Sequence, residues 1–116
     1  MLGTSCGDIF ESKTHISGNY YLVKSDTKDN ITISYKISQG DYIGRISPKV
    51  QEYAIIGDSL IVGKRLEKSL IQFYIVRIKR DSEYAEKRDY LIEPMDASVF
   101  DSIYTKKGKI EFIKAY

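Results

Sequence analysis

Cys6 and His15 are the only cysteine and the only histidine in the chain of 116 residues. A thiol beside an imidazole could act as a nucleophile, because the histidine can remove the proton from the sulfur. The two residues lie in a stretch of small and polar residues that offers no rigid positioning, so we expect no thiol enzyme. One cysteine also excludes an intramolecular disulfide, and one cysteine with one histidine cannot complete a zinc site.

The carboxylates form no recognisable metal-binding or catalytic pattern. Asp26 and Asp29 share one loop, and Asp81, Glu83 and Glu86 share another. Neither loop has the alternating oxygen ligands and the central glycine of a calcium loop, so we interpret both as solvated turns. The glycine-rich phosphate and dinucleotide motifs and the nucleophile elbow are also missing. The sequence therefore predicts no enzyme, no cofactor, no metal and no small-molecule substrate.

Basic and aromatic residues alternate in Y-I-V-R-I-K-R, which contains Tyr74, Arg77, Lys79 and Arg80. Such a pattern could stack bases and contact phosphates of a single-stranded nucleic acid. Basic residues at the end of a buried strand more often lead the chain into solvent, and the net charge of the whole chain is only +2. We therefore predict no nucleic-acid partner.

Tyrosine is abundant, with ten Tyr beside four Phe and no Trp. In a β domain tyrosines often pack at the edge of the core with their hydroxyl groups at the surface. Exposed tyrosines are also typical of protein-binding surfaces. The sequence leaves both interpretations open for the residues that we consider a candidate binding surface, namely Tyr20, Tyr21, Tyr42 and Tyr53.

The elements that would position these residues are mostly strands. Residues 31–38 give the clearest signal, because isoleucine and tyrosine alternate there with polar residues, as in a strand with one buried face. Residues 70–79 are apolar at nearly every position, so we expect the middle strand of the sheet there. Further strands are expected at 19–24, 42–46, 50–56, 60–64, 89–93 and 109–114, with Pro48 at a strand entrance or edge and Pro94 ending a strand.

One segment has the helical period. Val99, Phe100, Ile103 and Tyr104 fall on one helical stripe, and Asp96 is placed to cap the start of a helix over residues 96–107. Gly108 suits the end of that helix. We predict a mostly β (α+β) fold, an antiparallel meander of about seven or eight strands with one short C-terminal helix.

The segment before the first strand resembles the end of a bacterial lipoprotein signal. Small residues at 3–5 precede Cys6, and in lipoproteins the chain is cut just before a cysteine that then carries the lipid. Residues 7–17 lack a sustained period and are expected to be a tether. We therefore divide the chain into a signal remnant and tether at 1–17 and a single β-rich domain at 18–116. The resemblance implies a natural start upstream of Met1 and a membrane-anchored protein of the bacterial cell envelope, facing the periplasm or the exterior.

The remaining chain resembles a family of small bacterial lipoproteins of unknown function. The shared segments are Y-L-V at 21–23, I-S-P-K-V-Q-E-Y at 46–53, and the strand-to-helix stretch at 90–100. This resemblance implies an envelope location and no catalytic residues. The leading hypothesis is a non-enzymatic module that binds a protein partner through a tyrosine-bearing sheet face or edge. An immunity-type inhibitor of a bacterial toxin is the alternative.

Overall fold

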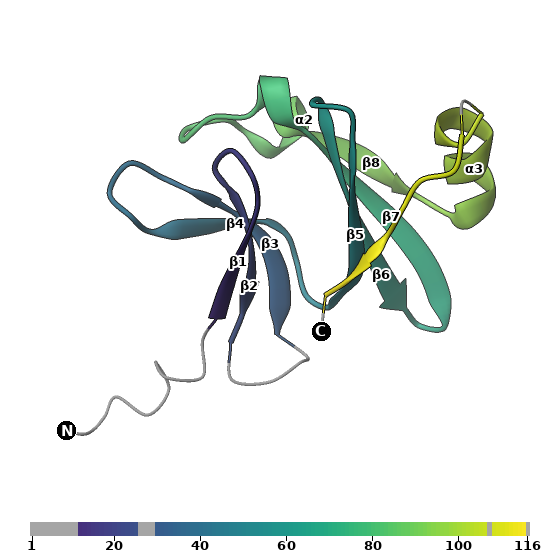
Figure 1. The fold of residues 1–116 in the computed structure, drawn as a ribbon, viewed down its shortest axis with the longest axis horizontal. Coiled ribbons are helices and arrows are strands. Elements are labelled where there is room, and N and C mark those ends of the chain that lie inside the picture. Colours follow the sequence, from purple (N-terminus) through teal and green to yellow (C-terminus); the bar gives the residue numbers. More distant parts are fainter. Residues whose placement is uncertain (1–11, 26–29, 107, 116) are drawn as a thin grey trace.

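The computed structural model describes residues 12–25, 30–106 and 108–115, which contain nine strands in two antiparallel sheets (Figure 1). None of the helices in these ranges has the length and apolar character needed to cross a membrane. The strands are β1 (Ser12–Ser17), β2 (Tyr20–Lys24), β3 (Ile31–Lys36), β4 (Tyr42–Ile46), β5 (Val50–Ile56), β6 (Leu60–Glu67), β7 (Leu70–Arg77), β8 (Leu91–Met95) and β9 (Ile113–Lys114). The helices are the 3-10 turn η1 (Ile78–Arg80), α2 (Lys87–Tyr90) and α3 (Ala97–Tyr104).

The first sheet is a meander in the order β1-β2-β3-β4. Strand β1 corrects the expected tether, because residues 12–17 pair along their length with β2. The turn between these strands consists of Gly18 and Asn19, with Gly18 at a φ of 54°, a backbone conformation that glycine adopts without strain. The predicted alternation over 31–38 is confirmed in part, since Ile31 and Ile33 are buried while Thr32 on the other face is partly exposed. The strand ends at Lys36, however, and Ser34, which was expected to face water, is buried.

The second sheet has the order β8-β7-β6-β5-β9. The apolar stretch 70–79 becomes β7 and η1, and β7 is covered on both faces as expected. Strand β7 is not the middle strand, however, because it lies between the edge strand β8 and the central strand β6. Pro94 lies inside β8 rather than after it. The edge position allows this, because on the side of an edge strand without a neighbour the missing N–H of proline breaks no hydrogen bond of the sheet. The last strand, β9, has only two residues.

The two sheets pack face to face, and α3 covers the outer face of the second sheet (Figure 1). The core between the sheets contains Leu22, Ile33 and Ile46 from the first sheet and Ile61 and Val76 from the second. A separate cluster under α3 is built on buried side chains of β6, β7 and the helix: Val62, Phe73, Ile75 and Phe100.

The mostly β antiparallel fold with a C-terminal helix is confirmed. The strands divide between two sheets because the chain leaves β4 at Ser47 and Pro48, as expected for a proline at a strand entrance. The C-terminal helix begins as predicted, with the Asp96 carboxylate accepting a hydrogen bond from the Val99 amide. It ends earlier than residue 107, with Thr105 as its C-cap. Helix α2 was not predicted.

Candidate protein-binding face

The face of the first sheet that points away from the second carries aromatic and basic side chains. Because side chains alternate along a strand, the pairing of Tyr21 with His15 places both on the face opposite the core residues Tyr20 and Leu22. Lys36 and Tyr42 are paired on the same face at the far side of the sheet. We call this surface the tyrosine–lysine face and define it as Lys13, His15, Tyr21, Lys36 and Tyr42.

The rings of the tyrosine–lysine face contact one another directly. Tyr21 and Tyr42 meet edge to face, with ring centres 5.3 Å apart, and His15 lies 5.0 Å from Tyr21. The Lys36 ammonium group lies 5.9 Å from the Tyr21 ring centre and 6.0 Å from that of Tyr42. Lys13 reaches to 5.2 Å from the Tyr42 ring centre. The long lysine side chains thus pack along partly exposed rings, which restricts the side chains before any partner binds.

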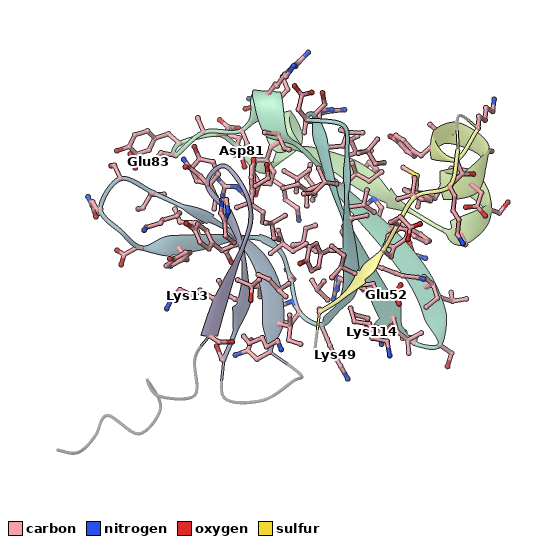
Figure 2. The ribbon with its side chains drawn as sticks, in the orientation of Figure 1. Lys13, Lys49, Glu52, Asp81, Glu83 and Lys114 are labelled. Carbon is pink, nitrogen blue, oxygen red and sulfur yellow. The ribbon has the colours of Figure 1, made fainter. Side chains whose placement is uncertain are left out.

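The strands contribute charge of one sign to this face. Within the described strands β1–β4, the charged positions on this face are Lys13 and Lys36, while Glu83, on the connection after β7, lies at its border near Tyr21 and Lys36. Figure 2 shows Lys13 extending away from the second sheet. Such a surface complements a partner that presents carboxylates.

Tyr20 and Tyr53 do not belong to this face. Their exposed fractions are 2% and 7%, and both lie in the core between the sheets. Of the four tyrosines proposed as a binding surface, the structure therefore brings only Tyr21 and Tyr42 together at the surface. The pattern Y-Y-L-V at 20–23 is apolar on both faces, so alternation alone could not show which tyrosine points inward.

Tyr20 instead belongs to a buried ionic cluster that ties β4 to the connection after β7. The Asp81 carboxylate accepts hydrogen bonds from Arg45 Nε at 2.8 Å and from the Tyr20 hydroxyl at 2.7 Å. Arg45 also donates to the Ser82 carbonyl at 2.9 Å and lies over the Tyr90 ring, 4.3 Å from its centre. The Arg45 and Asp81 side chains are only 4% and 0% exposed.

Burial shifts the ionisation of this cluster. The pKa of Tyr20 is raised well above its ordinary value, first by burial and then by its hydrogen bond to Asp81. Burial alone would lower the pKa of Arg45, but the hydrogen bond and the charge of Asp81 outweigh it and raise that pKa. Arg45 therefore stays charged and Tyr20 stays neutral, and the cluster links β2, β4 and the connection after β7.

A second link holds the same connection to the loop between β3 and β4. The Glu83 carboxylate accepts hydrogen bonds from the Ser38 backbone amide and hydroxyl, each at 2.7 Å. These bonds lower the pKa of Glu83, the backbone bond having the larger effect. Figure 2 shows Glu83 and Asp81 on the connection above β4. The two links fix the end of the sheet that carries Lys36 and Tyr42.

Among the residues that the structure describes, the other candidates of the sequence do not assemble into a site. Tyr74 is half-buried and donates a hydrogen bond to Glu67, while Lys79 and Arg80 lie exposed on η1, so the basic stretch forms no continuous groove with Tyr74. Cys6 lies outside the described residues. So do Asp26 and Asp29. In the described part of the chain, no group of three or more histidine, cysteine, aspartate or glutamate side chains could hold a metal ion.

No protein-family model, curated protein or solved structure matches this chain.

Sequence reasoning missed Lys13 and His15, since both were placed in the tether. The signal was available, because Gly-Asn at 18–19 between two short strand-like segments is typical of a tight hairpin. It also missed the pair of Arg45 and Asp81, which are 36 residues apart. The pairing of β3 with β4 contains a register shift, a β-bulge, that leaves the neighbouring residues Arg45 and Ile46 both buried. The alternation of apolar and polar residues in the sequence does not predict such a bulge.

Proposed function

We propose that this protein is a non-enzymatic lipoprotein of the bacterial cell envelope that binds an acidic protein partner through the tyrosine–lysine face. The observation that carries the binding proposal is the contact between partly exposed Tyr21 and Tyr42 with Lys36 packed over both rings. Tyrosine supplies a large contact area with few rotatable bonds, which is why it is enriched where binding energy is concentrated.

The rigidity of the face supports the same proposal. A side chain that is already ordered loses little conformational entropy when a partner binds. Here the rings and lysines order one another, and the hydrogen bonds from Ser38 to Glu83 hold the adjacent loop. A preorganised aromatic patch that carries two lysines suits a partner surface with exposed carboxylates.

The envelope location is proposed from the sequence around Cys6 and from the resemblance to small lipoproteins. Metabolic labelling with a palmitate analogue tests it in the native host. We expect the full-length gene product to take up the label and Cys6→Ser to lose it. An unlabelled protein in the soluble fraction would contradict the lipoprotein proposal without touching the binding proposal.

The binding proposal is tested by capture from an envelope extract followed by affinity measurement with the purified partner. We expect one stoichiometric protein with an acidic surface, and we expect Tyr42→Ala to weaken its binding by a factor of about 30, the loss typical of a central interface residue. Lys36→Gln should slow association and reduce the salt dependence of binding.

Two variants serve as matched controls. Leu70→Ala removes a large side chain that is 64% exposed on β7 and lies outside β1–β4, and Lys79→Gln removes an exposed charge on η1. Both should bind the partner like the wild type, and all variants should retain the wild-type melting temperature. Equal losses with Tyr42→Ala and Leu70→Ala would show that the tyrosine–lysine face is not the interface. If the partner is a toxin whose activity is blocked, the role becomes that of an immunity-type inhibitor.

A further inference from the structure

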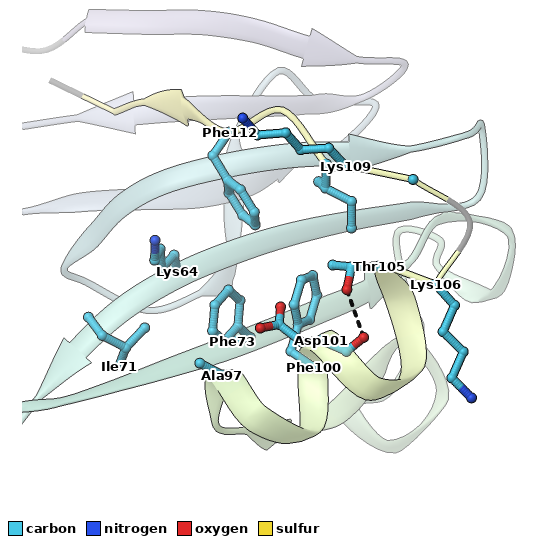
Figure 3. Close-up of a pocket in the computed structure, with 12 residues that line it drawn as sticks. Lys64, Ile71, Phe73, Ala97, Phe100, Asp101, Thr105, Lys106, Lys109 and Phe112 are labelled. Carbon is cyan, nitrogen blue, oxygen red and sulfur yellow. Dashed lines mark hydrogen bonds between the residues drawn. The ribbon is translucent and has the colours of Figure 1, made fainter.

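A groove on the opposite side of the molecule runs between α3, strands β6 and β7, and the segment that follows the helix (Figure 3). Its volume of about 770 Å³ lies in the range of small-molecule sites. We call it the α3 groove. Its apolar lining consists of Ile71, Phe73, Ala97, Phe100, Ile110 and Phe112.

The floor of the α3 groove is a fixed aromatic cluster. Phe73 stacks on Phe100 with ring centres 4.3 Å apart and an angle of 8° between the ring planes. Phe112 meets Phe73 edge to face at 6.0 Å. Phe73 and Phe100 are almost fully buried, whereas Phe112 is partly exposed. The two buried rings hold Phe112 in place, so a flat apolar group entering the groove would meet mainly the ordered Phe112 ring.

The charged groups around this floor are unevenly placed. The Lys64 ammonium group lies 5.3 Å from the Phe112 ring centre, and it also pairs with Glu52 at 3.1 Å. Lys109 extends along the C-terminal segment toward Phe112, whereas Lys106 also lines the groove but its side chain points away from Phe112 (Figure 3). Asp101 is the one carboxylate among the described lining residues, and it lies on the helix.

The surrounding charge favours an anion. The described residues that line the groove include three lysines, Lys64, Lys106 and Lys109, and one carboxylate, Asp101, a net charge of +2. Because the groove is shallow and its walls are apolar, a charged ligand group is stabilised only where it reaches an ammonium group at the rim. That position is beside Lys109 and Lys64, at the end of the groove formed by Phe112.

We infer that the α3 groove binds a small carboxylate with an aromatic body, separately from any protein bound at the tyrosine–lysine face. The ring lies on the phenylalanine floor, and the carboxylate lies beside Lys109, with Lys64 next to it. The Asp101 carboxylate repels the ligand anion and so limits its affinity. The ligand is thus recognised by an apolar body and one negative charge.

An NMR titration with two probes of the same shape and opposite charge tests this inference. The probes are 4-phenylbutanoate and 4-phenylbutylammonium, and the shifts of backbone amide resonances report both the site and the affinity. We expect the carboxylate to shift amides around Phe73, Phe100 and Phe112, with a dissociation constant on the order of 1 mM for so small a ligand. The ammonium probe should bind about three- to tenfold more weakly.

Three variants of the rim separate the roles of the charges. Lys109→Gln should weaken binding of the carboxylate about two- to fivefold, whereas Lys106→Gln removes the same charge from a side chain that points away from Phe112 and should change it much less. Asp101→Asn should tighten binding of the carboxylate, because it removes a negative charge that repels the ligand anion. The end of α3 should be retained in this variant, since only the backbone carbonyl of Asp101 takes part in the hydrogen bonds there.

Equal affinities for the two probes would overturn the inference, as would shifts confined to another part of the molecule. Equal losses with Lys109→Gln and Lys106→Gln would also overturn it, since they would indicate a diffuse field rather than a site. Each variant is compared at an unchanged melting temperature, so that a loss of binding is not mistaken for a loss of folding.

Discussion

Replacing Asp81 with asparagine should strongly destabilise the protein, because it removes the only negative charge shown to pair with the buried Arg45 side chain. The carboxylate accepts from three donors: Arg45 Nε, the Tyr20 hydroxyl and the Ser82 amide. An asparagine side chain has one acceptor oxygen, so at least one donor loses its partner and the guanidinium charge is uncompensated. Breaking a buried ion pair from one side costs about 3–5 kcal/mol.

That loss is large against the expected total. At about 0.05–0.15 kcal/mol per residue, a chain of 116 residues has a free energy of unfolding of about 6–17 kcal/mol. Urea unfolding followed by circular dichroism measures the difference. We expect Asp81→Asn to lower the urea midpoint with an unchanged slope, and to lower the melting temperature by about 10–25 °C.

A double-mutant cycle separates the ion pair from general damage to the core. Arg45→Met leaves the carboxylate buried without its cation and should cost a similar amount, while the double variant carries neither charge. Its loss should therefore be smaller than the sum of the two single losses by several kcal/mol. The exposed pair of Lys79 and Asp58, at 3.9 Å, gives the control, since Lys79→Met should change stability by less than about 0.5 kcal/mol. A cost below about 1 kcal/mol for Asp81→Asn, or strict additivity in the cycle, would refute the reasoning.

Three further changes test the packing. The folded protein holds the pKa of Tyr20 above its ordinary value of 10.0, so the stability that the neutral hydroxyl contributes is complete below that pH and is lost as the pH rises above it. Between about pH 8 and pH 11, the free energy of unfolding should therefore fall more steeply for the wild type than for Tyr20→Phe. Gly63→Ala should cost about 1–3 kcal/mol in urea unfolding, because its Cβ would lie 2.8 Å from Ile46 Cδ1, whereas Gly44→Ala meets no atom within 4 Å and should be nearly neutral. Asp96→Ala removes the N-cap of α3 and should cost about 1 kcal/mol, read from the melting temperature; no change would show that the cap contributes nothing.

Much of the secondary structure could be predicted because it depends on neighbouring residues. Strands β4 and β5 have the predicted bounds, since each begins and ends at a turn or at Pro48. The errors had local causes as well. Residues 12–17 were taken as a tether because polar side chains on an edge strand leave no apolar alternation to recognise. Pro94 was read as an end because the sequence does not show that β8 is at the edge of its sheet.

The candidate site could be predicted only in part. Tyr21 and Tyr42 were among the proposed surface residues, but so were Tyr20 and Tyr53, which the core between the sheets encloses. An aromatic residue in a strand is compatible with either face, and only the packing of the second sheet decides which one is covered. Whether these tyrosines bind a partner stays a prediction.

The sequence by itself determined the mostly β character, the positions of most turns and the start of α3, because alternation, glycine, proline and capping residues act over a few positions along the chain. The tertiary structure alone decided that the strands form two sheets, that Arg45 and Asp81 meet in the core, and that Lys36 lies over the rings of Tyr21 and Tyr42. These contacts join residues separated by up to tens of positions, and their partners are selected by which apolar faces can be buried together rather than by any local pattern.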